Sequence, residues 1–216
     1  ALPTTINNVE TLASVSHILN RGAEWYKGLC LSNPKSTGTK LISVCGHVQR
    51  PGNYEVTMGT PMKDLIFDMC GGMKPGRTLK AVIPGGSSVP IMTAAETEDC
   101  LLDYEGVVAR GSMLGSAGMI VMDDSTDMVY QIWRLARFYA HESCAQCTQC
   151  REGTAWTTKI LERILAGKGK EADLDLLLSL SENMTGKTIC VLSDSCAAPI
   201  VSGIAGDARS VRLANP

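Results

Sequence analysis

The sequence predicts an α+β fold in which a small strand-rich domain is followed by a helical region. Short strands and turns begin near Lys40, and from about residue 127 apolar residues recur at helical spacing with glycines between the repeats. With 216 residues and 44% apolar side chains, the chain can bury a sizeable core without disulfide bonds. Strands followed by helices indicate separate α+β units.

A helix is predicted near the start of the chain, after Asn8, whose side chain can cap it, and before Gly22, which can end it. Its apolar residues lie roughly on one face: Val9, Leu12, Ala13, Val15 and Leu19. The segment 32–39 is rich in Ser, Pro, Gly and Thr and is the best linker candidate. The chain begins with Ala rather than Met and shows no signal-peptide pattern. We therefore expect residues 1–36 to be the tail and linker of a larger domain.

A β-grasp domain is predicted for residues 37–125. Strands are expected at residues 41–45, 54–57, 81–83 and 119–122. The first two form a hairpin around the turn 51–53. Pro61 is placed to open a helix, which Gly71 would end. A hairpin, a helix and a further strand in this order are typical of a small β-grasp domain.

A helical domain is predicted for residues 126–216. Its first helix would be capped by Ser125 or Thr126. Its helices are marked by three apolar stripes: Val129, Ile132, Trp133, Ala136, Tyr139 and Ala140; Ile160, Leu161, Ile164 and Leu165; and Leu174, Leu177, Leu178 and Met184. Gly167 and Gly186 would end the second and third stripes. The sequence thus divides near residue 125.

Three of the nine cysteines, Cys144, Cys147 and Cys150, stand at intervals of three. A four-iron cluster usually takes four thiolates, commonly three from such a run and one from a distant segment. We predict Cys190 as the fourth ligand, because its apolar flanks suit a sulfur held in a dry pocket. Cys196 is the competing candidate. The spacing favours metal chemistry in a reducing compartment over a disulfide framework.

Zinc is the main alternative to an iron–sulfur cluster at these cysteines. A structural zinc site also uses four thiolates, but it usually pairs one C-x2-C with a second pair, which is absent here. His141 is an alternative ligand, although a capping or outer-shell role suits a lone histidine better. Gly153 and Thr154 predict a helix start just after the cysteine run, with backbone N–H groups facing the anionic cluster.

The remaining composition excludes several classes of function. A net charge of −2 gives no basic footprint for nucleic acid, and no apolar run approaches the roughly 18 residues that span a bilayer. We therefore expect no nucleic-acid partner and no direct membrane insertion. Free cysteines pack as small hydrophobic residues, so no function is assigned to the scattered ones, which are Cys30, Cys45, Cys70 and Cys100.

The motifs "HESCAQCTQCREG" and "GKTICVLSDS" resemble those of a family of flavoprotein subunits found in NADH-quinone oxidoreductase, also called respiratory complex I. Further blocks along the chain resemble the same family: "PTTINNVETLASV", "GTKLISVCGHVQRPGNYEV", "AVIPGGSSVPI" and "GSMLGSAGMIVMDDSTDMV". The combined pattern is long and specific, and it covers the C-terminal half of the family.

The resemblance implies a ubiquitin-like β-grasp domain of the SLBB type and then a four-helix bundle that carries a [4Fe–4S] cluster. It implies that the cluster ligands are Cys144, Cys147, Cys150 and Cys190. It also implies that Asn7 and Asn8 line a site for FMN, most of which is formed by residues that have no counterpart in this chain.

The function implied by the resemblance is electron transfer. NADH, bound by a domain that this chain lacks, would reduce FMN, and the cluster would pass the electrons to partner iron–sulfur subunits, including a 2Fe-2S thioredoxin-like subunit, and on to quinone. The protein would be peripheral, on the cytoplasmic side of a bacterial inner membrane or the matrix side of the mitochondrial one. The alternatives are a diaphorase subunit of an NAD-linked hydrogenase or formate dehydrogenase, or a non-catalytic electron carrier or docking module.

The chain departs from the family pattern at a few positions near the cysteines. Ala145 and Gln149 replace the usual Gly and Pro, Ser193 replaces a Gly, and Ala198 stands where an aromatic residue is common. A side chain in place of Gly can prevent a close approach of the backbone to sulfur. We expect these changes to affect the reduction potential more than the ligation.

Overall fold

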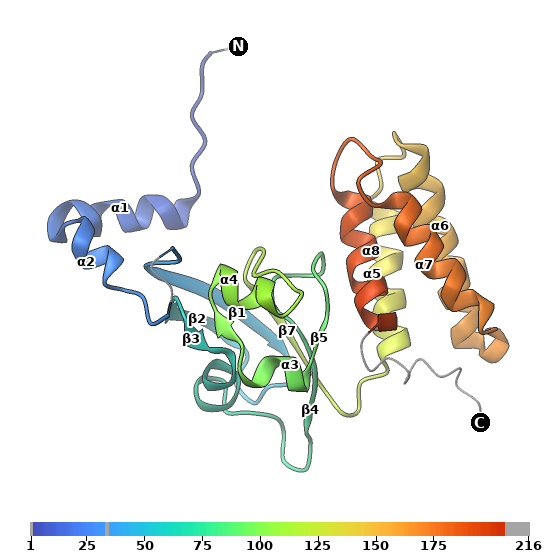
Figure 1. Ribbon diagram of the computed structural model, residues 1–216, viewed down its shortest axis with the longest axis horizontal. Helices are drawn as coiled ribbons and strands as arrows, with labels where there is room; N and C mark the ends of the chain where they lie inside the picture. The colour runs from blue at the N-terminus through green and yellow to red at the C-terminus, as the bar shows by residue number, and fades with distance from the viewer. Residues whose placement is uncertain (1, 33–34, 206–216) are drawn as a thin grey trace.

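The structure is a computed structural model that describes residues 2–32 and 35–205. It is a mixed α/β fold (Figure 1). A sheet-containing region lies in the middle, two N-terminal helices lie on one side of it, and a group of four longer helices lies on the other.

The N-terminal helix α1 (Val9–Arg21) is capped as predicted. The side-chain oxygen of Asn8 accepts a hydrogen bond from the backbone N–H of Glu10 at 2.8 Å, and Gly22 ends the helix with φ of 89°. A short helix, α2 (Ala23–Lys27), follows. No residue of either helix is buried, and Val9 is 80% exposed. The apolar stripe of α1 therefore faces solvent.

The main sheet has the strand order β2-β1-β7-β4-β5. Its strands are β1 (Thr39–Gly46), β2 (Gly52–Thr57), β4 (Leu79–Ile83), β5 (Met92–Thr93) and β7 (Gly118–Asp123). The predicted hairpin is confirmed by the antiparallel pairing of β1 and β2. Strand β7 runs parallel to β1 and antiparallel to β4, so the sheet is mixed. A second, two-stranded sheet joins β3 (Thr60–Pro61) and β6 (Leu101–Leu102).

The helix predicted to open at Pro61 and to end before Gly71 is present, and its helical residues begin one position later, at Met62. Pro61 ends the short strand β3, where it pairs with Leu101. Proline is tolerated at the end of a short strand because the N–H it lacks is not needed there. The helix that follows, η1 (Asp64–Met69), is a π-helix, and its end is marked by a hydrogen bond from Cys70 N–H to Leu65 O at 2.9 Å.

The sheet region encloses a dense apolar core. Its fully buried side chains include Ile42, Met62, Leu65, Ile66, Leu102 and Met119, each with no exposed surface. Two short helices, α3 (Ala94–Glu98) and α4 (Tyr104–Ala109), have N-terminal caps formed by Thr93 and Asp103. These helices and the two-residue strands are too short to show a periodic pattern, and the sequence did not predict them.

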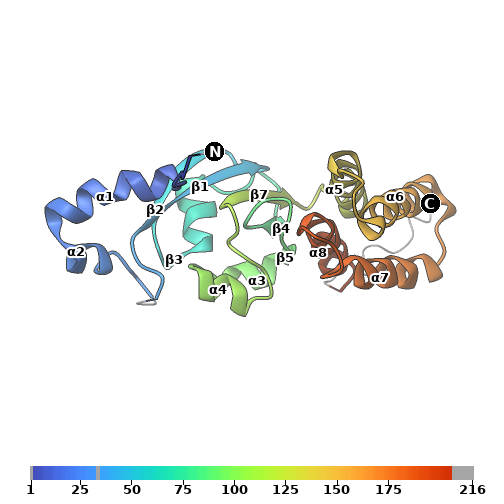
Figure 2. The same ribbon diagram turned by 90° about the horizontal axis from the view of Figure 1, so that it is seen from above.

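The four longer helices lie next to one another (Figure 2), and their buried side chains form one apolar core. They are α5 (Met128–Glu142), α6 (Thr148–Arg163), α7 (Ala172–Met184) and α8 (Leu192–Ala205), and a short π-helical segment, η2 (Ile164–Lys168), extends α6. The predicted stripes supply much of the core, including Ile132, Ala136, Ile160, Leu161, Leu177 and Met184. Residues 206–216 of the predicted domain lie outside the described residues.

The cap predicted for the first of these helices was wrong. Asp127 caps α5, and its carboxylate accepts a hydrogen bond from Tyr130 N–H at 3.1 Å. Ser125 instead donates its hydroxyl hydrogen to the Asp123 carboxylate at 2.5 Å, and the hydroxyl of Thr126 lies 3.3 Å from a ring nitrogen of His47. Of the neighbouring candidates, the one nearest the first helical N–H groups forms the cap.

The helices α5 and α8 contact the sheet region directly. The hydroxyl groups of Tyr139 and Ser87 are 2.8 Å apart, and Ile91 N–H donates to Ser202 Oγ at 2.9 Å. These bonds connect the helical region to the segment that joins β4 and β5. None of the helices within the described parts of the chain has the length and apolar character needed to cross a bilayer.

Candidate metal centre

Two loops at one end of the four helices carry the candidate ligands. The first connects α5 to α6 and contains Cys144 and Cys147, and the second connects α7 to α8 and contains Cys190. Both loops lie at the upper end of the helices in Figure 1. They touch, because the N–H of Ile189 donates to Cys147 Sγ at 3.4 Å. The distant segment thus lies against the cysteine run, as a shared site requires.

The cysteine run overlaps the start of α6. Cys147 is the N-cap residue, and Cys150 lies in the first turn and is 7% exposed. The prediction that the helix starts at Gly153 was therefore wrong, since helix α6 begins at Thr148. Gly153 serves packing instead, because a Cβ at this position would lie 2.4 Å from the sulfur of Met184.

Two helix N-termini point toward the cysteines. Helix α6 begins directly after Cys147, and α8 begins two residues after Cys190. The first N–H groups of a helix lack partners within it and carry partial positive charge. The expected positive potential near the cysteines therefore has two sources, the starts of α6 and α8. The start of α6, at Thr148, lies earlier in the chain than the predicted helix start at Gly153.

The argument that placed Cys190 in a dry pocket was wrong. Cys190 is exposed, and so are its neighbours Ile189 and Val191, with exposed fractions of 85% and 73%. The buried thiol is that of Cys196, which has no exposed surface. Burial raises the pKa of Cys196 to about 12, and the nearby Cys150 adds to this effect. In the structure the thiol of Cys196 is therefore packed in the helical core, whereas those of Cys144 and Cys190 are exposed in the two loops.

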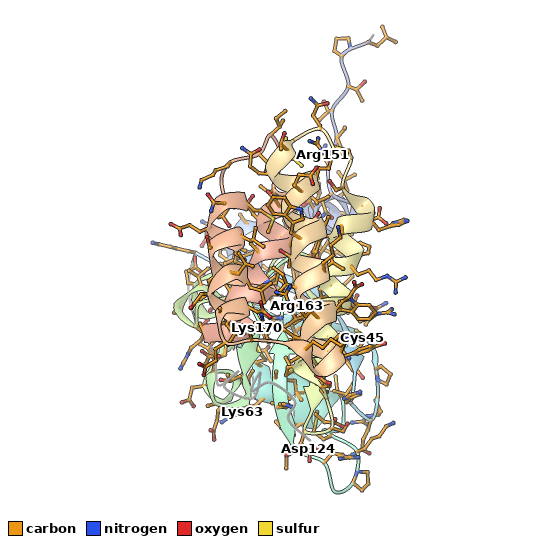
Figure 3. The ribbon with its side chains drawn as sticks, turned by 90° about the vertical axis from the view of Figure 1, so that its right-hand side faces the viewer. Cys45, Lys63, Asp124, Arg151, Arg163 and Lys170 are labelled. Carbon is orange, nitrogen blue, oxygen red and sulfur yellow. The ribbon has the colours of Figure 1, made fainter. Side chains whose placement is uncertain are left out.

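The turn that contains Ala145 is held from both sides. The N–H of Ala145 donates to Ser143 Oγ at 3.3 Å, and the carbonyl oxygen of Ala145 accepts a bond from Arg151 Nη1 at 2.7 Å. Ala145 has φ of 64°, a left-handed conformation that Gly adopts more easily. This explains why Gly is usual here in the resembling family. Figure 3 labels Arg151 at this end of the helices.

Residues at the start of α8 hold the loop of Cys190. The N–H of Gly186 donates to Asp194 Oδ1 at 2.9 Å, and the hydroxyl of Thr188 donates to Cys190 O at 2.8 Å. The hydroxyl of Ser193 lies 2.6 Å from that of Thr188, and the Ser193 side chain is fully buried. Ser193 thus adds a loop contact that Gly could not make.

The donor set consists of cysteine thiols, the ligand type that iron–sulfur clusters take in fours. A structural zinc ion also accepts thiolates. Among the described residues no group of three or more His, Cys, Asp or Glu side chains is gathered around one point. His141 is 84% exposed in its side chain, and its Nδ1 lies 3.0 Å from Glu142 Oε1.

Several predicted and unpredicted residues can now be placed. Asn8 caps α1, and Asn7, which precedes it, is exposed. In Figure 1 the N-terminal segment lies on one side of the sheet region, and the helices that carry the cysteines lie on the other. The contacts of Ser143 and Arg151 were missed. Their only signal in the sequence is their position directly beside the first and third cysteines of the run.

Two family models together match most of the chain. The family model of the SLBB domain matches residues 40–130, and that of the NADH-ubiquinone oxidoreductase-F iron–sulfur binding region matches residues 130–206. The fold and the site thus define the chain as an SLBB domain joined to an iron–sulfur binding region.

Curated relatives of this chain are found in bacteria. The F subunit of the NADH-quinone oxidoreductase of Rickettsia bellii (strain OSU 85-389) is 48% identical over 92% of this chain and 47% of its own length. The F 1 subunit of the same enzyme in Rhizobium meliloti (strain 1021) is 49% identical over 92% of this chain and 45% of its length. The chain therefore belongs to the family of NADH-quinone oxidoreductase flavoprotein subunits, as its motifs predict. It spans about half the length of these relatives.

A solved structure is similar to nearly the whole chain. The crystal structure of an NAD+-reducing [NiFe]-hydrogenase in the H2-reduced state matches with a TM-score of 0.84 and 33% identity, covering 97% of this chain and 34% of that one. An NAD+-reducing [NiFe]-hydrogenase in the air-oxidised state gives a TM-score of 0.82 and 34% identity. With 33–34% identity, compared with 48% for the protein of Rickettsia bellii, the hydrogenase chain is a more distant relative than the F subunit of that bacterium.

Proposed function

We propose that this chain is the cluster-carrying part of an NADH-quinone oxidoreductase flavoprotein subunit, with Cys144, Cys147, Cys150 and Cys190 as the ligands. The observation that carries the proposal is the hydrogen bond from Ile189 N–H to Cys147 Sγ at 3.4 Å, which joins the two cysteine-bearing loops. The match to an iron–sulfur binding region over residues 130–206 supports it independently.

A bound [4Fe–4S] cluster supplies a centre that accepts and releases one electron at a time. The chain's own residues hold and shield it. Cys150 is buried and limits access of water from the core side, while the exposed Cys144 and Cys190 lie at the surface, where a partner can approach. The N-termini of α6 and α8 offset the negative charge of the cluster and its thiolates.

For the whole protein we propose that the electrons come from NADH through FMN and leave to partner iron–sulfur subunits, including a 2Fe-2S thioredoxin-like subunit, and then to quinone. Asn7 and Asn8 would contact FMN in the complete protein. The protein would be peripheral, on the cytoplasmic side of a bacterial inner membrane or on the matrix side of the mitochondrial inner membrane.

We also propose the finer description of the fold. Residues 37–125 would form a β-grasp domain, which the hairpin β1–β2 and the parallel strand β7 support. Residues 126–216 would form a four-helix bundle, which the common core of α5, α6, α7 and α8 supports. Residues 1–36 would be the tail of the FMN- and NADH-binding domain.

A diaphorase subunit of an NAD-linked hydrogenase is the second candidate. The TM-score of 0.84 to the NAD+-reducing [NiFe]-hydrogenase supports it, but the identity of 33% is lower than the 48% to the protein of Rickettsia bellii. Purification of the native protein with its partners separates the two candidates. Copurifying quinone-reductase subunits support the first, and a nickel-containing partner supports the second.

The test of the site is anaerobic analysis of iron and sulfide with low-temperature EPR of the dithionite-reduced protein. We expect about four irons per chain, and we expect Cys190→Ser to lose or alter the EPR signal. Cys45→Ser is the matched control, since Cys45 is also exposed but lies on β1 in the sheet region. Zinc in place of iron, or a Cys190→Ser protein identical to wild type, contradicts the proposal.

A further inference from the structure

The side chain of Ser143 connects the turn of the cysteine run to the buried cysteine. Its Oγ lies 3.3 Å from Cys150 Sγ and accepts the N–H of Ala145 at 3.3 Å. Ser143 is also the C-cap of α5, and its own N–H donates to Tyr139 O at 3.0 Å. The bond to Tyr139 O places the backbone of Ser143, and the bond from Ala145 N–H restricts where its hydroxyl group can lie.

The roles of donor and acceptor follow from the chemistry of the two groups. A thiolate has no hydrogen, so an ionised Cys150 can only accept. The hydroxyl of Ser143 has one hydrogen, and because Oγ already accepts from Ala145, that hydrogen is free to point toward the sulfur. Resting on the proposed function, we infer that Ser143 is a positioning residue that donates an O–H···S hydrogen bond to the Cys150 thiolate and raises the reduction potential of the bound cluster.

The direction of the effect follows from charge. Reduction adds one electron to a centre that is already anionic, while the proton stays on Ser143 Oγ and no bond breaks. A hydrogen bond to a ligand sulfur stabilises the more negative, reduced state, so the potential rises. Cys150 is 7% exposed, and in such a weakly polar environment the bond is electrostatically stronger than at an exposed thiolate.

The test is a redox titration, followed by EPR, of the complete cluster-loaded protein and of three variants. We expect Ser143→Ala to keep its iron and titrate at a lower potential, and Ser143→Thr, which retains a hydroxyl, to titrate like wild type. Ser195→Ala is the matched control, because Ser195 also lies near a ligand loop but donates to Val191 O at 2.8 Å. It should leave the potential unchanged.

The outcomes separate this inference from the proposed function. A wild-type protein that contains no iron contradicts the proposed function, and this result does not depend on the role of Ser143. With four irons in both proteins, an unchanged potential in Ser143→Ala overturns the inference alone. Equal lowering by Ser143→Ala and Ser143→Thr also overturns it, since shape and not the hydroxyl would then matter. Loss of iron from Ser143→Ala contradicts the inference as well, because the serine would then be required for binding of the cluster, whereas a positioning role predicts that Ser143→Ala keeps its iron.

Discussion

The two ends of the helical region differ in the groups that they contain. At one end, which we call the ion-pair end (residues 163–173), the carboxylate of the buried Asp173 accepts bonds from the Arg163 side chain and from Lys170 N–H at 2.9 Å. At the other, the cysteine end (residues 143–147 and 185–191), the loops expose thiols and meet through one N–H···S bond.

Figure 3 shows the separation, with Arg151 labelled at the cysteine end and Arg163 and Lys170 nearer the other. The ion-pair end satisfies its polar groups with its own side chains. The cysteine end gathers soft donors at the surface, where apolar burial adds little stability. The first end is therefore stabilised by an ion pair whose carboxylate is buried. The second has hydrogen bonds within its loops, at Ala145 and Gly186, and we expect a ligand on its exposed thiols to add a further restraint.

Removal of the cluster is the strongest way to test this difference. We expect hydrogen exchange at the cysteine end to become about 100-fold faster in the iron-free protein, because local opening there loses its main restraint. Amides at the ion-pair end should change by no more than about threefold. Mass spectrometry of deuterium uptake in both forms measures this. Equal acceleration of exchange at both ends would show that the cluster stabilises the cysteine end no more than the ion-pair end.

Asp173→Asn tests the ion-pair end. The substitution removes the charge that Arg163 and Lys170 N–H recognise, and we expect the free energy of unfolding of the iron-free protein to fall by about 1.5 kcal/mol. The figure is modest because the Arg163 side chain is 43% exposed. Denaturant unfolding measures the change. Asp175→Asn, at a less buried position of the same helix, is the control and should cost less than about 0.5 kcal/mol.

Much of the fold could be predicted because the longer elements are periodic. The hairpin, the helix after Asn8 and the stripes of α5, α6 and α7 all follow from spacing. The one-residue offset at Pro61 and the wrong cap predicted before Asp127 have a different origin. Several neighbouring residues there have similar preferences, and tertiary contacts decide which of them begins the helix.

The candidate site was predicted from cysteine spacing, but its surroundings were not. The apolar neighbours of Cys190 predicted burial, yet they are exposed, because they lie in a loop at the end of the helices. Exposure there depends on the path of the loop and not on residue type. The contacts of Ser143 and Arg151 require the left-handed turn at Ala145. A single sequence that carries Ala there gives no signal of such a turn.

The pH dependence of stability tests the ion-pair end a second time. Hydrogen bonds from Arg163 lower the pKa of Asp173, against the opposing effect of its burial. A lowered folded-state pKa stabilises the protein above the ordinary value of about 3.9, and the contribution is lost as the pH falls through the folded pKa. The stability difference between wild type and Asp173→Asn should thus be largest near neutral pH and shrink below about pH 4. A difference that grows on acidification contradicts this assignment.

The smallest effect is expected at the cysteine end, from Ala145→Gly. The left-handed conformation costs alanine roughly 1–2 kcal/mol, and glycine gives back part of the gain through its more flexible unfolded chain. We expect a net stabilisation of about 0.5 kcal/mol, measured by denaturant unfolding. Ala155→Gly, within helix α6, is the matched control and should destabilise by about 1 kcal/mol.

The same substitution shows whether the strain is local to the cysteine end. Ala145 lies in the turn held by Ser143 and Arg151, so the gain should appear in hydrogen exchange of residues 143–147 and be absent at the ion-pair end. If Ala145→Gly lowers stability, the left-handed turn does not exist in the iron-free protein. The turn would then form only when the thiols are bound, and this end would depend on its ligand even more strongly than its exposed thiols imply.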